Sequence, residues 1–467
     1  MPSEPDDIGL LAEALQAMRA AAGSDAIDGV PLPDAARPVL LDVARRLGRS
    51  SPFAHPLYLA HMLKPPHPAA RLAYALALWP NPNNHAFDGG PASSAMEIEA
   101  VARIAGMFGW ADTLGHLCSG GTVANLEALW VARESSHGRP AGIAASVQAH
   151  YGHARAAALL GLPFHSVAVD SRGRMDPAAL RALLRQGAVG TVVATLGTPA
   201  AGAVDPLDEI AALCAEHGAR LHADAAYGGY FRLARNLAPD AAGALAAAGA
   251  ADSIVVDPHK HGLQPYGCGC VLLRDAALRR VYAHDPGYAY LASDEPHLGA
   301  IALECSRPGA AAVALWTTLQ LLPLEPGGDF ARGLEAGRDA ALQLWRALAQ
   351  DDRLAARFAV LLPPDLDVVV WAVRAASARA ASAQARVLQR AAQSAGLHLS
   401  MARLPRAMVE PWQAVTLWDA PDVVVLRACV MKPQQRDWMP RILDALRHAA
   451  AGVPATGDTV PAAVAGH

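Results

Sequence analysis

Two residues with complementary chemistry each follow a short apolar run. Lys260 closes the segment Asp257-Pro258-His259-Lys260, directly after the run 253–256, and Asp224 ends an earlier run. If both runs are buried strands, these side chains lie at the edge of an α/β sheet, where ligands bind. An amine that can hold an aldehyde and a carboxylate that can keep a ring nitrogen protonated are the pair that pyridoxal phosphate needs.

A glycine-rich helix start precedes this pair in the chain. Ser119, Gly120, Gly121 and Thr122 lead into a predicted helix over 123–134. The free N–H groups and the positive dipole end of such a helix start form a site for a phosphate group. No lysine follows the glycines, so the segment is not a Walker loop.

Four further side chains suit the same cofactor by their order in the chain. His150 follows the predicted strand 143–147, and its ring could stack on a pyridine ring. Ala226 would lie under the opposite face of that ring, where only a small side chain fits. Thr198, in a turn after another strand, is a candidate for the ring hydroxyl, and His259 is one for the phosphate. His150 and Thr198 could instead have a purely structural role, in which their side chains cap a helix or bond to nearby backbone groups.

The elements that would position these residues alternate between apolar runs and helix-length segments. This alternation predicts an α/β fold with a mostly parallel sheet flanked by helices. The last two runs resemble a hairpin and could include an antiparallel strand. The predicted strands are 143–147, 165–169, 191–196, 220–224, 253–257 and 268–273.

Pattern changes divide the chain into four parts. Residues 1–85 are predicted to form an N-terminal arm that makes dimer contacts. The arm begins helical and is irregular from Ser51 to Asn84, where prolines and histidines are frequent. Residues 86–328 form the large cofactor-binding domain, and Glu325-Pro326-Gly327-Gly328 ends it. Residues 329–450 are expected to form a small α+β domain, and 451–467 a disordered tail.

Composition excludes several functional classes. Hydrophobic residues make up 53% of the chain and charged residues 18%, so a large core can form. The net charge of −4 leaves no basic excess for nucleic acid, and no apolar run is long enough to span a membrane. The N-terminus lacks a signal-peptide pattern, and the six cysteines lack metal-ligand spacing. We expect a cytoplasmic protein with reduced cysteines and no metal.

Three segments of this chain resemble group II pyridoxal-phosphate-dependent amino-acid decarboxylases, and the bacterial tyrosine and aromatic L-amino-acid decarboxylases most of all. The resemblance covers about residues 50 to 440 and includes Asn81-Pro82-Asn83-Asn84 and the motif at 426–433. The three segments are Gly121-Thr122-Val123-Ala124-Asn125 with its flanks, His222 to Tyr230, and Ser253 to Lys260 with Pro265-Tyr266.

The resemblance implies a fold-type I enzyme that is a homodimer, with a seven-stranded type of sheet and active sites at the subunit interface. Lys260 would carry the Schiff base, Asp224 would pair with the ring nitrogen, and His150 would stack on the ring. The phosphate would be held by Ser119, Gly120, Gly121, Thr122 and His259. Ser306 matches a segment that reaches a neighbouring subunit's cofactor in relatives.

The resemblance also implies an acid that protonates the substrate carbon. Relatives acting on aromatic substrates often carry this tyrosine on a long loop after the lysine. The segment from Tyr282 to Ser306 is short. Tyr288 is the nearest match by order, with Tyr290 and His150 as its rivals.

The leading functional prediction is therefore α-decarboxylation of an L-amino acid to its amine and carbon dioxide. The alternatives are carbon–carbon lyase chemistry, oxidative decarboxylation to an aldehyde, and an inactive scaffold of the same fold. An aromatic, tyrosine-like substrate is favoured by four side chains of the arm, whereas glutamate or aspartate would need a cation such as Arg307 or Lys64. The four side chains are Phe53, Tyr58, His61 and Trp79, with His55 nearby.

Overall fold

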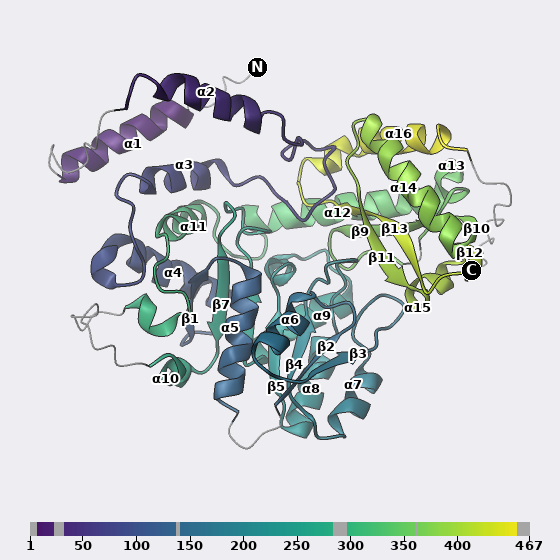
Figure 1. Cartoon of the computed structure of the whole chain (residues 1–467), viewed down its shortest axis with the longest axis horizontal. Helices are drawn as coiled ribbons and strands as arrows, with labels where there is room; N and C mark the ends of the chain where they lie inside the picture. The colour runs from purple at the N-terminus through teal and green to yellow at the C-terminus, as the bar shows by residue number, and fades with distance from the viewer. Residues whose placement is uncertain (1–6, 23–31, 137–140, 284–296, 361, 455–467) are drawn as a thin grey trace.

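The computed structural model of the chain describes residues 7–22, 32–136, 141–283, 297–360 and 362–454. A large α/β unit lies beside a smaller unit built from the C-terminal third of the chain, and the N-terminal helices lie above the large unit (Figure 1).

The core of the large unit is a seven-stranded sheet with the order β1-β7-β6-β5-β4-β2-β3. Strand β7 is antiparallel to both of its neighbours, while the pairs from β6 to β3 are parallel. The predicted α/β fold and its antiparallel strand are thus confirmed. The strands are β1 (Leu114–Cys118), β2 (Gly142–Ser146), β3 (Phe164–Val167), β4 (Val189–Thr195), β5 (Arg220–Asp224), β6 (Ser253–Val256) and β7 (Gly269–Leu273).

Helices cover both faces of this sheet, and as a result every residue of β2, β4, β6 and β7 is buried. Such continuous burial is typical of parallel strands between two helix layers. The helices of this unit are α4 (Pro91–Met107), α5 (Gly121–Glu134), α6 (Gly152–Leu159), α7 (Pro177–Leu184), α8 (Leu207–His217), α9 (Pro239–Ala246), α10 (Arg279–Tyr282) and α11 (Ala310–Leu321).

The smaller unit is an antiparallel sheet of order β11-β13-β9-β8 with helices packed against it. A short parallel pair, β10 with β12, forms a separate two-stranded sheet. Its helices are α12 (Asp329–Gln350), α13 (Asp352–Ala355), α14 (Ala378–Ser394), α15 (Arg406–Val409) and α16 (Gln435–Ala451). Its strands are β8 (Phe358–Ala359), β9 (Val368–Val373), β10 (Ala375–Ser377), β11 (Ser400–Pro405), β12 (Val415–Leu417) and β13 (Asp422–Cys429). The predicted domain boundaries remain predictions.

The N-terminal region contains α1 (Asp7–Ala22), α2 (Ala36–Leu47) and α3 (Pro68–Ala77). Helix α3 lies within the segment 51–84 that sequence patterns predicted to be irregular. His67 caps α3 by accepting a hydrogen bond from the Ala69 N–H at 3.3 Å, and Pro68 occupies its first turn. The proline and histidine that suggested irregular chain are therefore the start signals of this helix.

Strand β1 was not expected, because a histidine interrupts its apolar run. His116 is buried, and its Nε2 lies 2.8 Å from Glu127 Oε1 on α5. Helix α4 begins at Pro91, three residues before Ser94-Ala95-Met96-Glu97, whose spacing is that of a capping box. Glu97 makes no capping contact but accepts the Leu117 N–H at 2.9 Å, which joins α4 to β1.

No helix in the described part of the chain is long and apolar enough to cross a membrane.

Candidate active site

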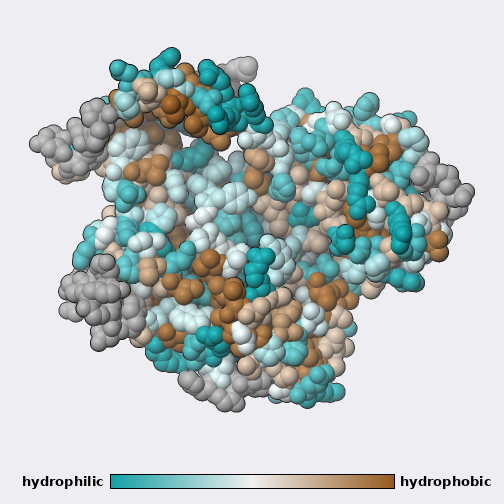
Figure 2. Space-filling model, in the orientation of Figure 1, coloured by the Kyte–Doolittle hydropathy of each residue, from teal (hydrophilic) through white to brown (hydrophobic). Residues whose placement is uncertain are grey.

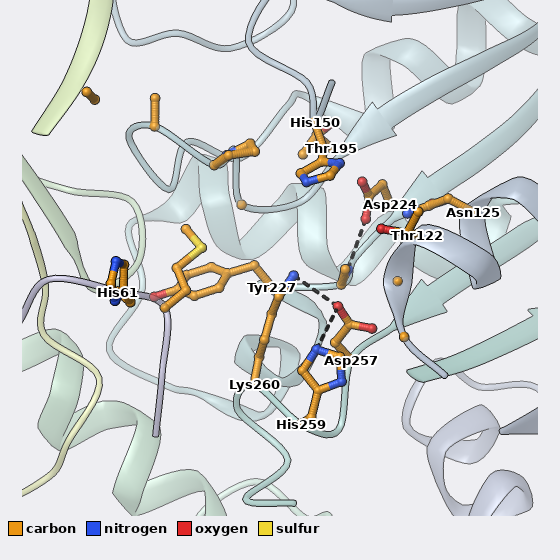
Figure 3. Close-up of a pocket in the computed structure, with 18 of the residues that line it drawn as sticks. His61, Thr122, Asn125, His150, Thr195, Asp224, Tyr227, Asp257, His259 and Lys260 are labelled. Atoms are coloured by element: carbon orange, nitrogen blue, oxygen red, sulfur yellow. Dashed lines mark hydrogen bonds and ion pairs between the residues drawn. The ribbon is translucent and has the colours of Figure 1, made fainter. Parts of the chain in front are cut away.

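A cavity of about 690 Å³ opens where the carboxyl ends of the parallel strands face the small unit (Figure 3). The strands β2, β4, β5 and β6 are neighbours in the sheet, so the residues that follow them meet at this edge. The arm and the strands β11 and β13 contribute the remaining wall. The lining includes His61, Met62, Ser119, Gly120, Gly121, Thr122, Asn125, His150, Thr195, Asp224, Ala226, Tyr227, Asp257, His259, Lys260, Met401, Ala402, Arg403 and Arg427.

Lys260 lies in the turn after β6, and its side chain reaches the cavity. Its Nζ is 3.0 Å from Asp257 Oδ2, and His259 Nε2 is 3.6 Å from the same oxygen. Figure 3 shows the lysine and the histidine converging on the one carboxylate. Asp257 was part of the sequence motif, but its contact with Lys260 was not predicted.

Asp224 ends β5 and is buried at the base of the cavity. Its Oδ2 accepts a hydrogen bond from His153 Nε2 at 2.8 Å, and its Oδ1 accepts the Ala226 N–H at 3.2 Å. Burial alone would raise the pKa of Asp224, but the hydrogen bond and charge of His153, helped by Lys260, hold that pKa well below its usual range. This carboxylate therefore remains ionised at all physiological pH values.

His153, which sequence reasoning missed, is the third residue after His150. It lies in the first turn of α6 and is buried. Its position in the sequence could have identified it, because side chains in the first helical turn after a strand lie near the strand ends.

His150 lies in the loop between β2 and α6. Its Nδ1 accepts the Gly152 N–H at 3.1 Å, so a neutral ring carries its proton on Nε2. Burial lowers the pKa of His150, which favours this neutral form. His150 can therefore donate a hydrogen bond from Nε2 to a group in the cavity.

The helix start at α5 has the shape of a phosphate site. Gly120 has φ +152°, and a Cβ on Gly121 would lie 2.6 Å from Asp257 Oδ2. Neither position therefore accommodates a larger residue. The Ser119 N–H is bonded to Glu304 Oε2 at 2.9 Å.

Thr198 does not line the cavity, contrary to the expectation that it contacts the cofactor. It is fully buried, and its Oγ1 accepts the Ala203 N–H at 3.0 Å, which closes the turn after β4. Thr195 lines the cavity instead, and its buried Oγ1 has no hydrogen-bond partner within the described residues. Three positions along an irregular turn separate the two threonines, and sequence order alone could not choose between them.

Of the predicted substrate-pocket residues in the arm, His61 lines the cavity. Its Nδ1 lies 2.5 Å from the hydroxyl of Tyr58, which is buried behind it. Phe53 packs edge-on against Tyr58 at 5.2 Å, outside the lining. Trp79 is 44% exposed and also lies outside the lining.

Arg307 lies outside the lining of this cavity. It is buried, its Nη1 is 2.8 Å from Glu97 Oε1, and the same nitrogen donates to the Leu117 carbonyl. Ser306 also lies outside the lining, where its Oγ accepts a hydrogen bond from Asn83 Nδ2 at 3.1 Å. Tyr288 and Tyr290 lie outside the described residues.

Arg427 was not predicted to reach the cavity. It is buried on β13 and donates to the carbonyls of Ala200 and Pro199 at 2.9 and 2.8 Å. Arg403 on the edge strand β11 also borders the cavity. Both arginines belong to the small unit. The sequence motifs did not predict how this unit packs against the large unit.

This arrangement fits a flat, phosphorylated aromatic aldehyde. The helix start accepts the phosphate, Lys260 offers an amine for the aldehyde, and Asp224 offers a permanent charge to a ring nitrogen. The hydroxyl of Thr195 and Oδ1 of Asp257 have no hydrogen-bond partner among the described residues, which leaves hydrogen-bonding capacity inside the cavity. The described residues contain no cluster suited to a metal ion.

Comparison with protein families gives an independent result. Residues 68–373 match the pyridoxal-dependent decarboxylase conserved domain. A probable L-tyrosine/L-aspartate decarboxylase of Methanothermobacter thermautotrophicus is 28% identical over 316 residues, covering 67% of this chain and 82% of the relative. An L-2,4-diaminobutyrate decarboxylase of Rhizobium meliloti is 32% identical over 361 residues, covering 73% and 70%.

Solved structures show the same fold. The structure of Oryza sativa TDC with PLP and tryptamine has a TM-score of 0.75 at 19% identity, covering 97% of this chain and 99% of the other. Mouse CSAD in its apo form has a TM-score of 0.72 at 22% identity, covering 95% and 100%.

Proposed function

We propose that the chemistry of this protein takes place in the cavity around Lys260. The chain belongs to the pyridoxal-dependent decarboxylase family. It is thus a pyridoxal-phosphate-dependent amino-acid decarboxylase. The observation that carries this assignment is the meeting of Lys260, Asp224 and the α5 start in one cavity at the carboxyl edge of the sheet.

When bound, pyridoxal phosphate supplies a conjugated ring that accepts the electron pair left by the departing carboxylate. Lys260 would bind the aldehyde of the cofactor through its amine. Asp224 keeps a proton on the ring nitrogen, because its own proton affinity is low and its charge is fixed by His153. His150 and Ala226 border the cavity, so the ring would lie against a histidine and beside a small side chain.

The phosphate is assigned to the α5 start. Gly120, Gly121 and Thr122 would supply N–H groups, and Ser119 and Thr122 would supply hydroxyls. His259 borders the same space, since a Cβ on Gly120 would lie 3.1 Å from His259 Cε1. A dianion at this position is stabilised by the positive end of the 14-residue helix α5.

After carbon dioxide leaves, the substrate Cα must receive a proton. Among the described residues, His150 borders the cavity and is a candidate for this step, although its lowered pKa favours the neutral ring, which is a weak acid. Tyr288, the acid matched by sequence order, remains a prediction, with Tyr290 as its rival.

We infer that the substrate is an L-amino acid with an aromatic side chain. The support is the cluster of Phe53, Tyr58 and His61, which approaches the cavity from the arm and ends at its wall. An acidic side chain is the second candidate, because Arg427 and Arg403 border the same cavity. The names of the two relatives include an aromatic, an acidic and a basic amino acid, so they do not choose between the two classes.

We also propose a cytoplasmic homodimer. The support for the dimer is α2, whose apolar side chains Leu40, Val43 and Leu47 are 59%, 45% and 68% exposed. Figure 2 shows apolar residues gathered on the N-terminal helices. Ser306, which lies outside its own cavity, is the candidate to reach the partner's cofactor.

Two measurements test the proposed function. A panel of aromatic and acidic L-amino acids should release carbon dioxide in the presence of pyridoxal phosphate, with an aromatic member fastest. Borohydride reduction should fix the cofactor on the peptide that contains Lys260. Label on another lysine would overturn the site assignment, and faster turnover of an acidic substrate would reverse the order of the two substrate classes.

A further inference from the structure

Tyr58 and His61 form a hydrogen-bonded pair that ends at the wall of the cavity. The hydroxyl of Tyr58 lies 2.5 Å from His61 Nδ1, and it has no other hydrogen-bond partner among the described residues. Tyr58 is 3% exposed, whereas His61 is exposed and lines the cavity. The pair therefore has one buried end and one end that faces the space for the substrate.

The burial of Tyr58 determines the direction of this hydrogen bond. Burial raises the pKa of the Tyr58 hydroxyl, so this group keeps its proton. A buried O–H group is normally paired, and the acceptor beside this one is His61 Nδ1. The hydroxyl therefore donates to Nδ1, and His61 carries its single ring proton on Nε2.

The Nε2–H group of His61 is available to a ligand. It has no hydrogen-bond partner among the described residues. The two ring nitrogens of a histidine point in divergent directions, so Nε2 points away from the buried Tyr58 and toward the cavity that His61 lines. His61 thus presents a fixed hydrogen-bond donor to the cavity.

The positions of Lys260 and Asp224 indicate what this donor meets. In Figure 3, Lys260 lies between Asp224 on one side and His61 on the other. The aldehyde carbon and the nitrogen of pyridoxal phosphate are at opposite ends of its ring, so a ring between Lys260 and Asp224 has its aldehyde end toward His61. A substrate whose amine meets that aldehyde therefore has its side chain on the His61 side of the cavity.

The wall next to His61 suits an aromatic ring. Met62 and Tyr227 line the cavity there. The Tyr227 hydroxyl donates to Asp367 Oδ1 at 2.5 Å, and a Cβ on Gly197 would lie 3.0 Å from Tyr227 Cδ1. The ring of Tyr227 is thus held in place with its hydroxyl already used, and it offers the substrate an aromatic surface.

We propose that His61, held by Tyr58, selects substrates that carry a hydroxyl group on an aromatic ring. This inference rests on the proposed decarboxylase function. His61 Nε2–H donates to the oxygen of that hydroxyl while the substrate ring lies against Met62 and Tyr227. An unsubstituted ring leaves the N–H group without this acceptor and binds more weakly. Tyr58 is the positioning residue, because it acts through His61.

The experiment compares L-tyrosine with L-phenylalanine, which differ by this hydroxyl alone. Carbon dioxide release by the full-length protein loaded with pyridoxal phosphate gives kcat and KM for each. The wild-type kcat/KM should favour L-tyrosine by about tenfold or more. His61→Leu should remove most of this preference, because leucine has no N–H group in its side chain.

Tyr58→Phe tests the positioning role with little change in packing. The phenyl ring still packs against Phe53, and the carbonyl of residue 58 still accepts Lys432 Nζ. A bond far from the reacting carbon contributes equally to the bound substrate and the transition state. Tyr58→Phe should therefore raise KM for L-tyrosine about fivefold, with kcat nearly unchanged, and leave both constants for L-phenylalanine as they are.

Tyr74→Phe is the matched control. Tyr74 lies on α3 in the same arm, packs against the core of the large unit and is outside the cavity lining. The variant loses a tyrosine hydroxyl that does not contact His61, so it should retain the wild-type preference for L-tyrosine.

The outcomes separate this inference from the proposed function. Equal losses for the two substrates in Tyr58→Phe would assign Tyr58 a packing role and overturn the inference, as would a wild type without preference for L-tyrosine. L-aspartate as the best substrate, with a KM that rises in Tyr58→Phe, would assign the Nε2–H group to a side-chain carboxylate instead. Absence of carbon dioxide from every aromatic and acidic amino acid would contradict the proposed function itself.

Discussion

The charge of Asp224 shows how one buried contact can prepare a residue for chemistry. A carboxylate on a buried strand is costly unless a partner stabilises it. His153 provides that partner at 2.8 Å, from a helix that begins six residues after β2 ends. Asp224 also borders the cavity, so its carboxylate could form a second hydrogen bond there, to a protonated ring nitrogen.

Replacement of Asp224 by asparagine tests this arrangement. An amide cannot hold a proton on the ring nitrogen, so Asp224→Asn should retain the cofactor and lower kcat by about 100-fold or more. The measurement combines carbon dioxide release with the absorbance of bound cofactor. Near-normal turnover at full cofactor occupancy would assign the ring nitrogen to another group.

Sequence positions predicted those site residues that directly follow strands or begin a helix. Lys260, Asp224 and Gly121 belong to this group, because the ends of parallel strands converge wherever the sheet forms. Thr195 and Arg427 were missed for different reasons. The position of Thr195 depends on the path of the turn after β4. The position of Arg427 depends on how the small unit packs against the large unit.

At the scale of elements, buried polar contacts join segments that are distant in sequence. His222 on β5 lies 2.7 Å from Asn125 Oδ1 on α5 and 2.8 Å from Ser253 Oγ on β6. The amide oxygen accepts from Nε2, and the serine hydroxyl donates to Nδ1, so the ring is neutral. Burial lowers the pKa of His222 to about 3.

This depressed pKa predicts a pH dependence of stability. Between about pH 3 and the ordinary histidine pKa of about 6.5, the unfolded chain binds a proton that the folded chain excludes. The stabilisation from neutral His222 is thus fully present above pH 6.5 and is lost as pH falls toward 3. In His222→Gln, the free energy of unfolding should fall less steeply over this window, by about 1.4 kcal/mol per pH unit. Parallel slopes in urea denaturation of the two proteins would contradict this.

The pair of Arg307 and Glu97 joins the chain after residue 297 to α4. Both side chains are at most 5% exposed, and the carboxylate also accepts the Leu117 N–H. Removing one member leaves the other buried without its counter-charge.

Arg307→Met should therefore lower the free energy of unfolding of the apoprotein by about 3–5 kcal/mol. Arg274→Met is the comparison, because its pair with Asp252 is half exposed, and its loss should cost about 1 kcal/mol or less. Urea denaturation of both variants gives the difference. Equal costs would mean that Arg307 contributes no more than a surface ion pair.

Sequence periodicity predicted most elements and failed where polar residues belong to an element's interior. The apolar runs of β4, β5 and β6 were identified within two residues of their observed bounds. Strand β1 was missed because His116 is buried only through its contact with Glu127, which a linear pattern does not reveal. Helix α3 was missed because the proline that begins it was interpreted as a break.

At the scale of the whole molecule, α2 lies apart from the two units (Figure 1). None of its residues is buried, and Leu40, Val43 and Leu47 share one face at a spacing of three and four residues. An apolar face of this kind is stable in water only when something covers it. A second copy of the chain is the occupant that the proposed homodimer provides.

The double variant Leu40→Asp with Leu47→Asp tests this assembly, because it places two charges where apolar surfaces would meet. Wild-type protein should sediment as a dimer and the double variant should shift toward monomer at the same concentration. Arg45→Asp changes the net charge by the same amount on the opposite face of α2, so it should leave the dimer intact. Cofactor capture by Lys260 is then measured on the separated species, since residues from two chains would complete each site. A wild-type monomer with full activity would show that the apolar face of α2 has another purpose.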